Sequence, residues 1–205
     1  MKLIRGYDAT TLREQVDPDA CAERLAEISH QRSIPALLER VWLLKVLMRL
    51  DEALELAEET VRQARMLGTR ADLLRARVLR ATVRQWRGEH LLADREYAVA
   101  AEEAEGRGWA QIAAFAHQHR GKNAYESGDF EAARESFKAS LFRRRESGAD
   151  DEDLEIALRA IEAAERRQVR GERAEPVDAE LPTSNEPTAA RDGRDGATRR
   201  RFGIA

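Results

Sequence analysis

The sequence predicts an all-α fold, a right-handed α-solenoid of helix-turn-helix repeats that ends in a capping helix and a disordered tail. Three observations carry this prediction. Charged residues make up 36% of the chain and aromatic residues only 5%, which suits long exposed helices better than a compact β-rich core. A period of forty residues runs through the middle of the chain. Within each period, two apolar-periodic runs are separated by a turn.

The repeat is visible as columns of identical residues forty positions apart. Alanine, glycine and arginine each recur three times in one register, and a fourth column combines a small residue with two aromatic residues. The columns are Ala53, Ala93 and Ala133; Gly68, Gly108 and Gly148; Arg40, Arg80 and Arg120; and Ala57, Tyr97 and Phe137. Such self-similarity is typical of a helical repeat protein.

Turn and capping residues divide each unit into two helices. An apolar-periodic run from about Gln111 to Ser127 ends at a glycine, and Asp129 then offers an oxygen to cap a second run from Phe130 to about Glu146. Gly148 follows at a position that favours a left-handed residue. In the preceding unit, Thr69-Arg-Ala-Asp72 has the spacing of a capping box. The first unit is less regular, because Met48 replaces the turn glycine.

These signals divide the chain into three parts. Residues 1–32 form an N-terminal segment with one capping helix, which begins after Asp17-Pro18-Asp19 and runs to about His30. Residues 33–170 form the repeat domain, with units at about 33–68, 69–108 and 109–148 and a capping helix at 151–169. Residues 171–205 contain three prolines and few apolar residues, which predicts a disordered, charged tail.

The segment from Gly121 to Ser140 resembles the core of a tetratricopeptide repeat. That family places a small residue in the first helix, a glycine at the turn, and then an alanine, an aromatic and a small residue along the second helix. The matching residues are Gly121, Gly128, Ala133, Phe137 and Ser140 in one unit and Ala81, Gly88, Ala93, Tyr97 and Ala100 in the other. The resemblance implies a protein-binding solenoid. The longer period, compared with the usual 34 or so residues, is similar to that of bacterial regulatory proteins.

The sequence contains no recognisable catalytic or metal-binding pattern. His117 and His119 are two apart on a predicted helix and therefore point about 200° from each other, so they cannot share a metal ion. The one cysteine, Cys21, excludes an internal disulfide, and without a base beside it a structural role is favoured. We therefore expect neither an enzyme nor a bound cofactor. No window approaches eighteen apolar residues, so we expect a cytoplasmic protein without a membrane partner.

The first helices of a solenoid line a concave groove, and their forty-residue columns identify its side chains. These combine rigid aromatic area with directed donors, as binding hot spots do. For the tryptophans, a packing role and a groove position are equally open. The predicted partner-binding residues are Trp42, Lys45, Arg75, Thr82, Gln85, Trp86, Phe115, His119, Lys122, Tyr125 and Arg159.

The favoured function is that of an adaptor or scaffold that holds another protein or a peptide in this groove. One alternative is a regulatory protein that senses a small molecule or signal peptide and acts through a partner. Nucleic-acid association through Arg194 and Arg199–Arg201 is a weaker alternative, because so short a basic run binds weakly and with strong salt dependence. The basic end of the tail could also self-associate with groove carboxylates, for which the candidates are Glu39, Glu126 and Glu162.

Overall fold

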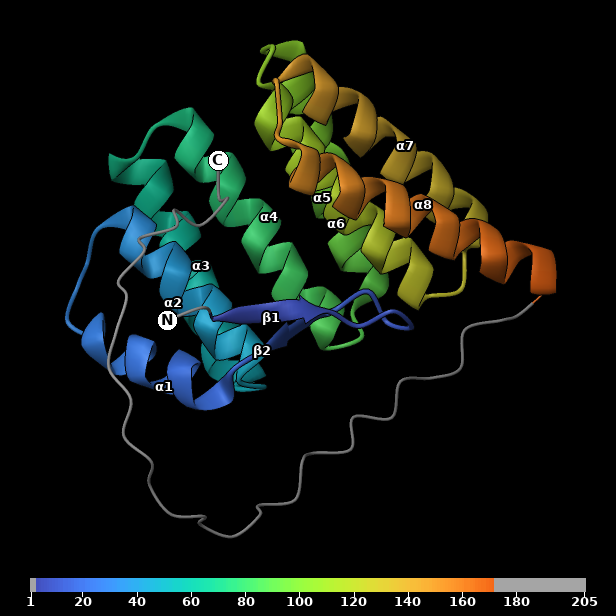
Figure 1. The fold of residues 1–205 in the computed structure, drawn as a ribbon. Coiled ribbons are helices and arrows are strands. Elements are labelled where there is room, and N and C mark those ends of the chain that lie inside the picture. Colours follow the sequence, from blue (N-terminus) through green and yellow to red (C-terminus); the bar gives the residue numbers. More distant parts are fainter. Residues whose placement is uncertain (1–2, 172–205) are drawn as a thin grey trace, which may run out of the picture.

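The structure is a computed structural model that describes residues 3–171. Within this range two short strands precede eight helices (Figure 1). The elements are β1 (Ile4–Tyr7), β2 (Glu14–Val16), α1 (Pro18–Glu27), α2 (Ile34–Val46), α3 (Leu50–Leu67), α4 (Arg70–Trp86), α5 (His90–Gly106), α6 (Ala110–Glu126), α7 (Phe130–Glu146) and α8 (Asp151–Arg170). The helical repeat fold is confirmed, whereas the predicted tail lies, apart from Gly171, outside the described residues.

The helix caps confirm the turn chemistry read from the sequence. The Asp129 side chain accepts a hydrogen bond from the backbone N–H of Ala132 at 3.0 Å, at the start of α7. At the start of α4, Thr69 and Asp72 form the reciprocal hydrogen bonds of a capping box. Both caps satisfy backbone donors that the first turn of a helix leaves without partners.

The helices form two layers that follow from their order in the chain. The first helices of successive repeats, α2, α4 and α6, contact one another directly, and each second helix packs between its neighbours in sequence. The last helix, α8, packs on α7 and closes the stack, as Figure 1 shows. The side chains of α2, α4 and α6 therefore form one continuous inner layer.

Small residues allow paired helices to approach closely. Ala53, Ala93 and Ala133 are fully buried. A Cβ atom added at Gly121 would lie 2.5 Å from the Phe137 ring, so only glycine fits between α6 and α7 at this position. Phe137 itself is fully buried and fills the space that the small residues leave.

The N-terminal segment contains the predicted helix and also a β-hairpin that sequence reasoning missed. Asp17 caps α1 as expected, because its side chain accepts from the backbone N–H of Ala20 at 3.1 Å. Before it, β1 and β2 pair antiparallel, with Ile4 opposite Val16 and Tyr7 opposite Glu14. We call residues 3–16 the N-terminal hairpin.

The cysteine of the N-terminal segment has the structural role that the sequence favoured. Cys21 is fully buried in the core formed by α1 to α4. Burial raises the pKa of its thiol to about 11, so the thiol is protonated at neutral pH. A protonated, enclosed thiol packs as a small apolar group.

Met48 adopts a left-handed backbone conformation, with φ 60°, at the turn position where later repeats have Gly88 (φ 80°) and Gly128 (φ 84°). A side chain in this region costs roughly 1–2 kcal/mol. We expect Met48→Gly to raise the free energy of unfolding by roughly 0.5–1 kcal/mol, because glycine removes the strain but adds unfolded-state entropy. Urea denaturation measures the change. The matched control, Gly88→Ala, should lower stability, and an unchanged midpoint for Met48→Gly would contradict the strain.

Candidate functional site

The N-terminal hairpin lies across the inner layer of the solenoid (Figure 1). At one end, Ile4 and Val16 pack against the core of α1 to α4. At the other end, Leu12 joins the core cluster that α6, α7 and α8 contribute. The hairpin therefore joins the first and last parts of the repeat domain, and the side chains between these ends form the candidate site.

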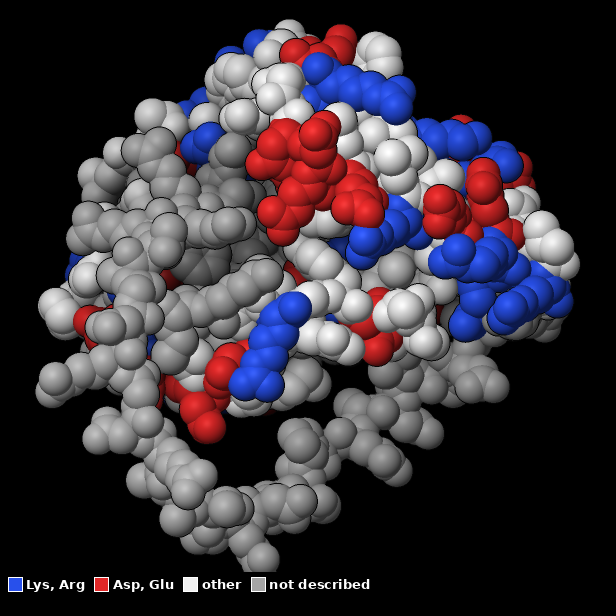
Figure 2. Space-filling model, viewed as in Figure 1, with Lys and Arg blue, Asp and Glu red and all other residues white. Residues whose placement is uncertain are grey.

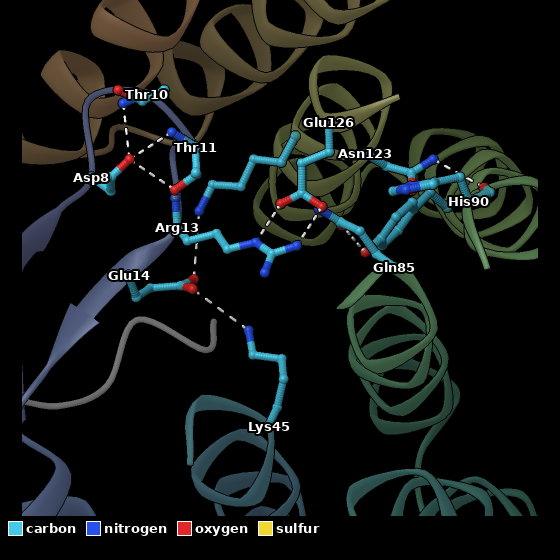
Figure 3. A network of polar contacts seen from close by, with 12 residues as sticks. Asp8, Thr10, Thr11, Arg13, Glu14, Lys45, Gln85, His90, Asn123 and Glu126 are labelled. Carbon is cyan, nitrogen blue, oxygen red and sulfur yellow. Dashed lines mark hydrogen bonds and ion pairs between the residues drawn. The ribbon is translucent and has the colours of Figure 1, made fainter. Parts of the chain in front are cut away.

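Glu14 stands at the centre of this site, between two lysines from different repeats. Its carboxylate oxygens lie 3.6 Å from Nζ of Lys45 on α2 and 3.5 Å from Nζ of Lys122 on α6 (Figure 3). None of the three side chains is more than 9% exposed. Burial by itself would raise the pKa of the Glu14 carboxyl, but the two ammonium groups outweigh it and hold that pKa well below its usual range. Glu14 is therefore an enclosed anion.

Arg13 makes the second anchoring contact of the hairpin. Its guanidinium donates two hydrogen bonds to the Glu126 carboxylate on α6, at 2.8 and 3.0 Å, in the bidentate geometry typical of strong pairs (Figure 3). It also lies 4.7 Å from the centre of the Trp86 ring on α4. Nζ of Lys45 lies 4.7 Å from the centre of the same ring, so Trp86 makes cation–π contacts with both side chains.

We call the side of α2, α4 and α6 that contacts the hairpin the inner face, formed by Lys45, Trp86, Lys122 and Glu126. Three of these four residues, Lys45, Trp86 and Lys122, are among those predicted from the sequence. Lys122 also lies 5.0 Å from the Tyr7 ring of the hairpin, and burial together with Glu14 raises the pKa of that phenol to about 12. The inner face is therefore covered by charged and aromatic groups of the chain itself.

His119 lies buried beside the inner face. Its ring contacts Phe115 edge-on at 4.5 Å and stacks on Tyr97 at 6.2 Å. Burial is the main reason that the pKa of His119 lies well below 6.5, and the charges of Lys122 and Lys45 lower it further. The imidazole is therefore uncharged at neutral pH.

Four further predicted residues serve packing or internal hydrogen bonds. Trp42 is buried in the core of α1 to α4. Tyr125 packs edge-on against Phe130 at 5.3 Å. The Thr82 hydroxyl donates to the carbonyl of Leu79 at 2.7 Å, on its own helix.

The fourth of these residues, Gln85, accepts a hydrogen bond from the hydroxyl of Tyr97 at 2.8 Å. Both side chains are fully buried, so this bond joins α4 to α5 in the interior. Gln85 therefore serves an internal hydrogen bond.

The structure does not bring Arg75 and Arg159 into the site. Arg75 lies near the beginning of α4 and pairs with Asp72 on the same helix, whereas Trp86 ends that helix, about 16 Å along its axis. The Arg159 side chain is 72% exposed and pairs with Glu155. Its helix, α8, packs on the outer helix α7, so the forty-residue column does not continue along the inner layer.

The predicted groove carboxylates also separate. Glu39 accepts from Arg24 of α1 at 2.6 Å, and the exposed Glu162 pairs with Arg166 on its own helix. Of the three candidates, Glu126 is the one that meets the hairpin. Acidic side chains gather over the beginning of α8 and basic ones over its end (Figure 2), an order that complements the helix dipole.

Arg13 and Glu14 are the residues of the candidate site that sequence reasoning missed. The available signal was the turn chemistry before them: Asp8 Oδ1 accepts hydrogen bonds from the backbone N–H groups of Thr10 and Thr11, at 2.9 and 2.6 Å. Leu12 then takes a left-handed conformation, with φ 59°. Asp followed by threonines predicts a turn, but the strands beside it are too short to show a period.

Two kinds of feature are absent from residues 3–171. No group of three or more His, Cys, Asp or Glu side chains is arranged to hold a metal ion. No helix in the same range is long and apolar enough to span a membrane.

The buried neutral His119 makes stability depend on pH. Its folded-state pKa lies below the unfolded value of about 6.5, so the unfolded chain gains a proton first as the pH falls, and stability is lost. Between pH 7.5 and 5.5 we expect this group to contribute a loss of about 1.4 kcal/mol. Chemical denaturation of wild type and His119→Gln over this window measures the difference in slope. An equal slope in wild type and His119→Gln would contradict the assignment.

Comparisons with known proteins identify a structural likeness without a family. No family model matches the chain, and no curated protein matches it. Among solved structures, the chain is similar to the crystal structure of BtubC (BKLC) from P. vanneervenii. The two share 14% sequence identity with a TM-score of 0.49, over 86% of this chain and 79% of the other.

Proposed function

We propose that the chain is a protein-binding adaptor whose inner face receives an extended segment carrying a carboxylate. The observation that supports this proposal most directly is the position of Glu14 between Lys45 and Lys122. An extended strand there presents one acidic side chain to two ammonium groups from different repeats. A partner segment with the same chemistry would find both cations already aligned.

The charges of the inner face favour an anionic ligand. Without the hairpin, Lys45, Lys122 and Glu126 carry two positive charges and one negative charge. A ligand that covers this face would enclose both ammonium groups, which is costly unless the ligand places an anion or a set of acceptors beside them. The Trp86 ring adds a rigid aromatic surface of the kind that dominates binding energy at interfaces. A ligand carboxylate would therefore restore the balance that Glu14 supplies.

We also propose that the repeats are of the tetratricopeptide type. The close approach of Gly121 to the Phe137 ring and the left-handed turn at Gly128 support this assignment. Protein or peptide binding is the role that the resemblance implies. The inner face of α2, α4 and α6 then corresponds to the concave groove expected from the sequence.

Peptide display on the full chain tests the proposed function. The chain would carry Glu14→Gln, so that no carboxylate of its own competes for the lysines, and a library of linear peptides would be selected on it. We expect the enriched peptides to contain Asp or Glu in an otherwise uncharged or apolar setting. The affinity of these peptides should fall by roughly tenfold or more when the lysine charges that form the salt bridges are removed.

The matched control is the same chain with Lys45→Met and Lys122→Met, which keeps an unbranched side chain, one heavy atom shorter, at both positions and removes the charge. Circular dichroism would verify that both chains remain helical. Selection of the same peptides by both chains, or enrichment of peptides without acidic residues, would contradict the proposal.

A further inference from the structure

We infer that the N-terminal hairpin is an intramolecular competitor for the inner face, and that Leu12-Arg13-Glu14 displays the sequence chemistry of the partner segment. This inference rests on the proposed function and adds to it a way of regulating access to the inner face and a class of ligand. The ligand would be an extended segment with an apolar, a basic and an acidic residue in succession.

The hairpin is a small element that depends on the helices for its structure. Its strands have four and three residues, and their pairing is irregular between Ile4 and Gly6. A two-stranded hairpin of this size is marginally stable alone in water. Within residues 3–171, no backbone–backbone hydrogen bond joins it to α2–α8. Side-chain contacts therefore hold it in place, and their loss would release it as a unit.

The ion pairs make docking conditional on Glu14. The free-energy cost of moving two charges out of water is about as large as the attraction between them in the interior, so a buried ion pair adds little net stability. Loss of one partner is strongly destabilising, because the other charge stays buried without a counterion. If Glu14 leaves, Lys45 and Lys122 remain enclosed without their shared anion. Release of the hairpin then returns both ammonium groups to water. Docking thus depends on a matched anion at this one position.

Asp17 connects the hairpin directly to the solenoid. It caps α1 and also pairs with Arg5 of β1 at 2.6 Å, so the hairpin ends where the helix begins. A tether this short gives the hairpin an effective concentration of the order of millimolar at the inner face. A partner segment of equal intrinsic affinity would therefore be held off unless it were concentrated or made additional contacts.

The three consecutive residues of the hairpin each contact different residues of the helical layer. Leu12 packs in the cluster that includes Ala124, Tyr125 and Phe130. The other two contacts are those of Arg13 with Glu126 and Trp86 and of Glu14 with the lysines. A segment that makes all three contacts must carry an apolar, a basic and an acidic residue in this order and in this chain direction. A single charge would fix neither the order nor the direction of the bound segment.

Binding of the hairpin's own peptide in trans tests the inference. The probe is a fluorescein-labelled synthetic peptide with the sequence of residues 3–17, titrated by anisotropy into full-length chains. Glu14→Lys places a third cation beside Lys45 and Lys122 and should release the tethered hairpin. We expect the probe to bind Glu14→Lys at least tenfold more tightly than wild type. Hydrogen exchange should show that the amides of residues 4–16 lose protection in this variant.

Two further variants serve as controls. Gln15→Lys introduces the same residue at the exposed neighbouring position of β2 and should bind the probe as wild type does. Glu14→Lys combined with Lys122→Glu exchanges the charges, which should restore hairpin protection and exclude the probe again. A merely destabilised chain would not recover in this way.

The outcomes separate the inference from the proposed function. If the probe bound wild type and Glu14→Lys equally well, and Lys122→Met abolished its binding to both, the competitor role would be overturned and the binding function would stand. An exposed hairpin in Glu14→Lys without probe binding would overturn both. Retained protection in Glu14→Lys would show that Glu14 does not control docking. Wild-type dimers that exchange hairpins, detected by sedimentation, would overturn the intramolecular assignment.

Discussion

The close approach of paired helices sets the geometry on which the rest of the structure depends. Where α7 crosses α6, Phe137 lies against a position that has no room for a Cβ atom, and buried alanines play the same part in the other repeats. Because each pair repeats this packing, α2, α4 and α6 follow one another with a constant offset. Lys45 and Lys122 are 77 residues apart, about one helical turn short of two periods. They consequently reach the same carboxylate from opposite sides of α4.

Electrostatics then determines what can cover this layer. The scaffold contributes Lys45, Lys122 and Glu126, and the hairpin contributes Arg13 and Glu14, so each side supplies the counterions of the other. This charge cluster, shared between the helices and the hairpin, specifies one register of the hairpin, because a slip of one residue along β2 would turn Glu14 away from the lysines. Apolar contacts at both ends of the hairpin fix its register, and the ion pairs at the centre form only in that register.

The sequence predicted the helices well, since each extends over several turns and ends at a capping residue or a turn glycine. It also predicted that Lys45, Trp86 and Lys122 lie on the inner helices, where the structure places them, although they belong to three different forty-residue columns. It left two roles open for Trp42, which lies in a core cluster that also includes residues of α1 and of the hairpin, outside the repeat. Arg159 was misplaced because α8 packs on an outer helix.

The hairpin escaped prediction for a different physical reason. Strands of four and three residues are too short to establish a period of two, and their stability comes from residues far along the chain. Arg13 and Glu126, for example, are separated by 113 positions. A single sequence carries no local sign of such a pair. The turn residues Asp8, Thr10 and Thr11 indicated where the chain reverses, but not that it would cross the inner layer.

The burial of two lysines has a practical consequence in a chain that has only four. Amine-directed reagents modify the ε-amino group only where they can reach it. The Lys138 side chain is 47% exposed, whereas Lys45 and Lys122 are almost wholly enclosed beneath the hairpin. Mass spectrometry after brief acetylation would therefore report, peptide by peptide, the fraction of molecules in which the inner face is uncovered. Lys138 would serve as the internal standard, so that the ratio follows occupancy of the inner face in a cell extract without any added label.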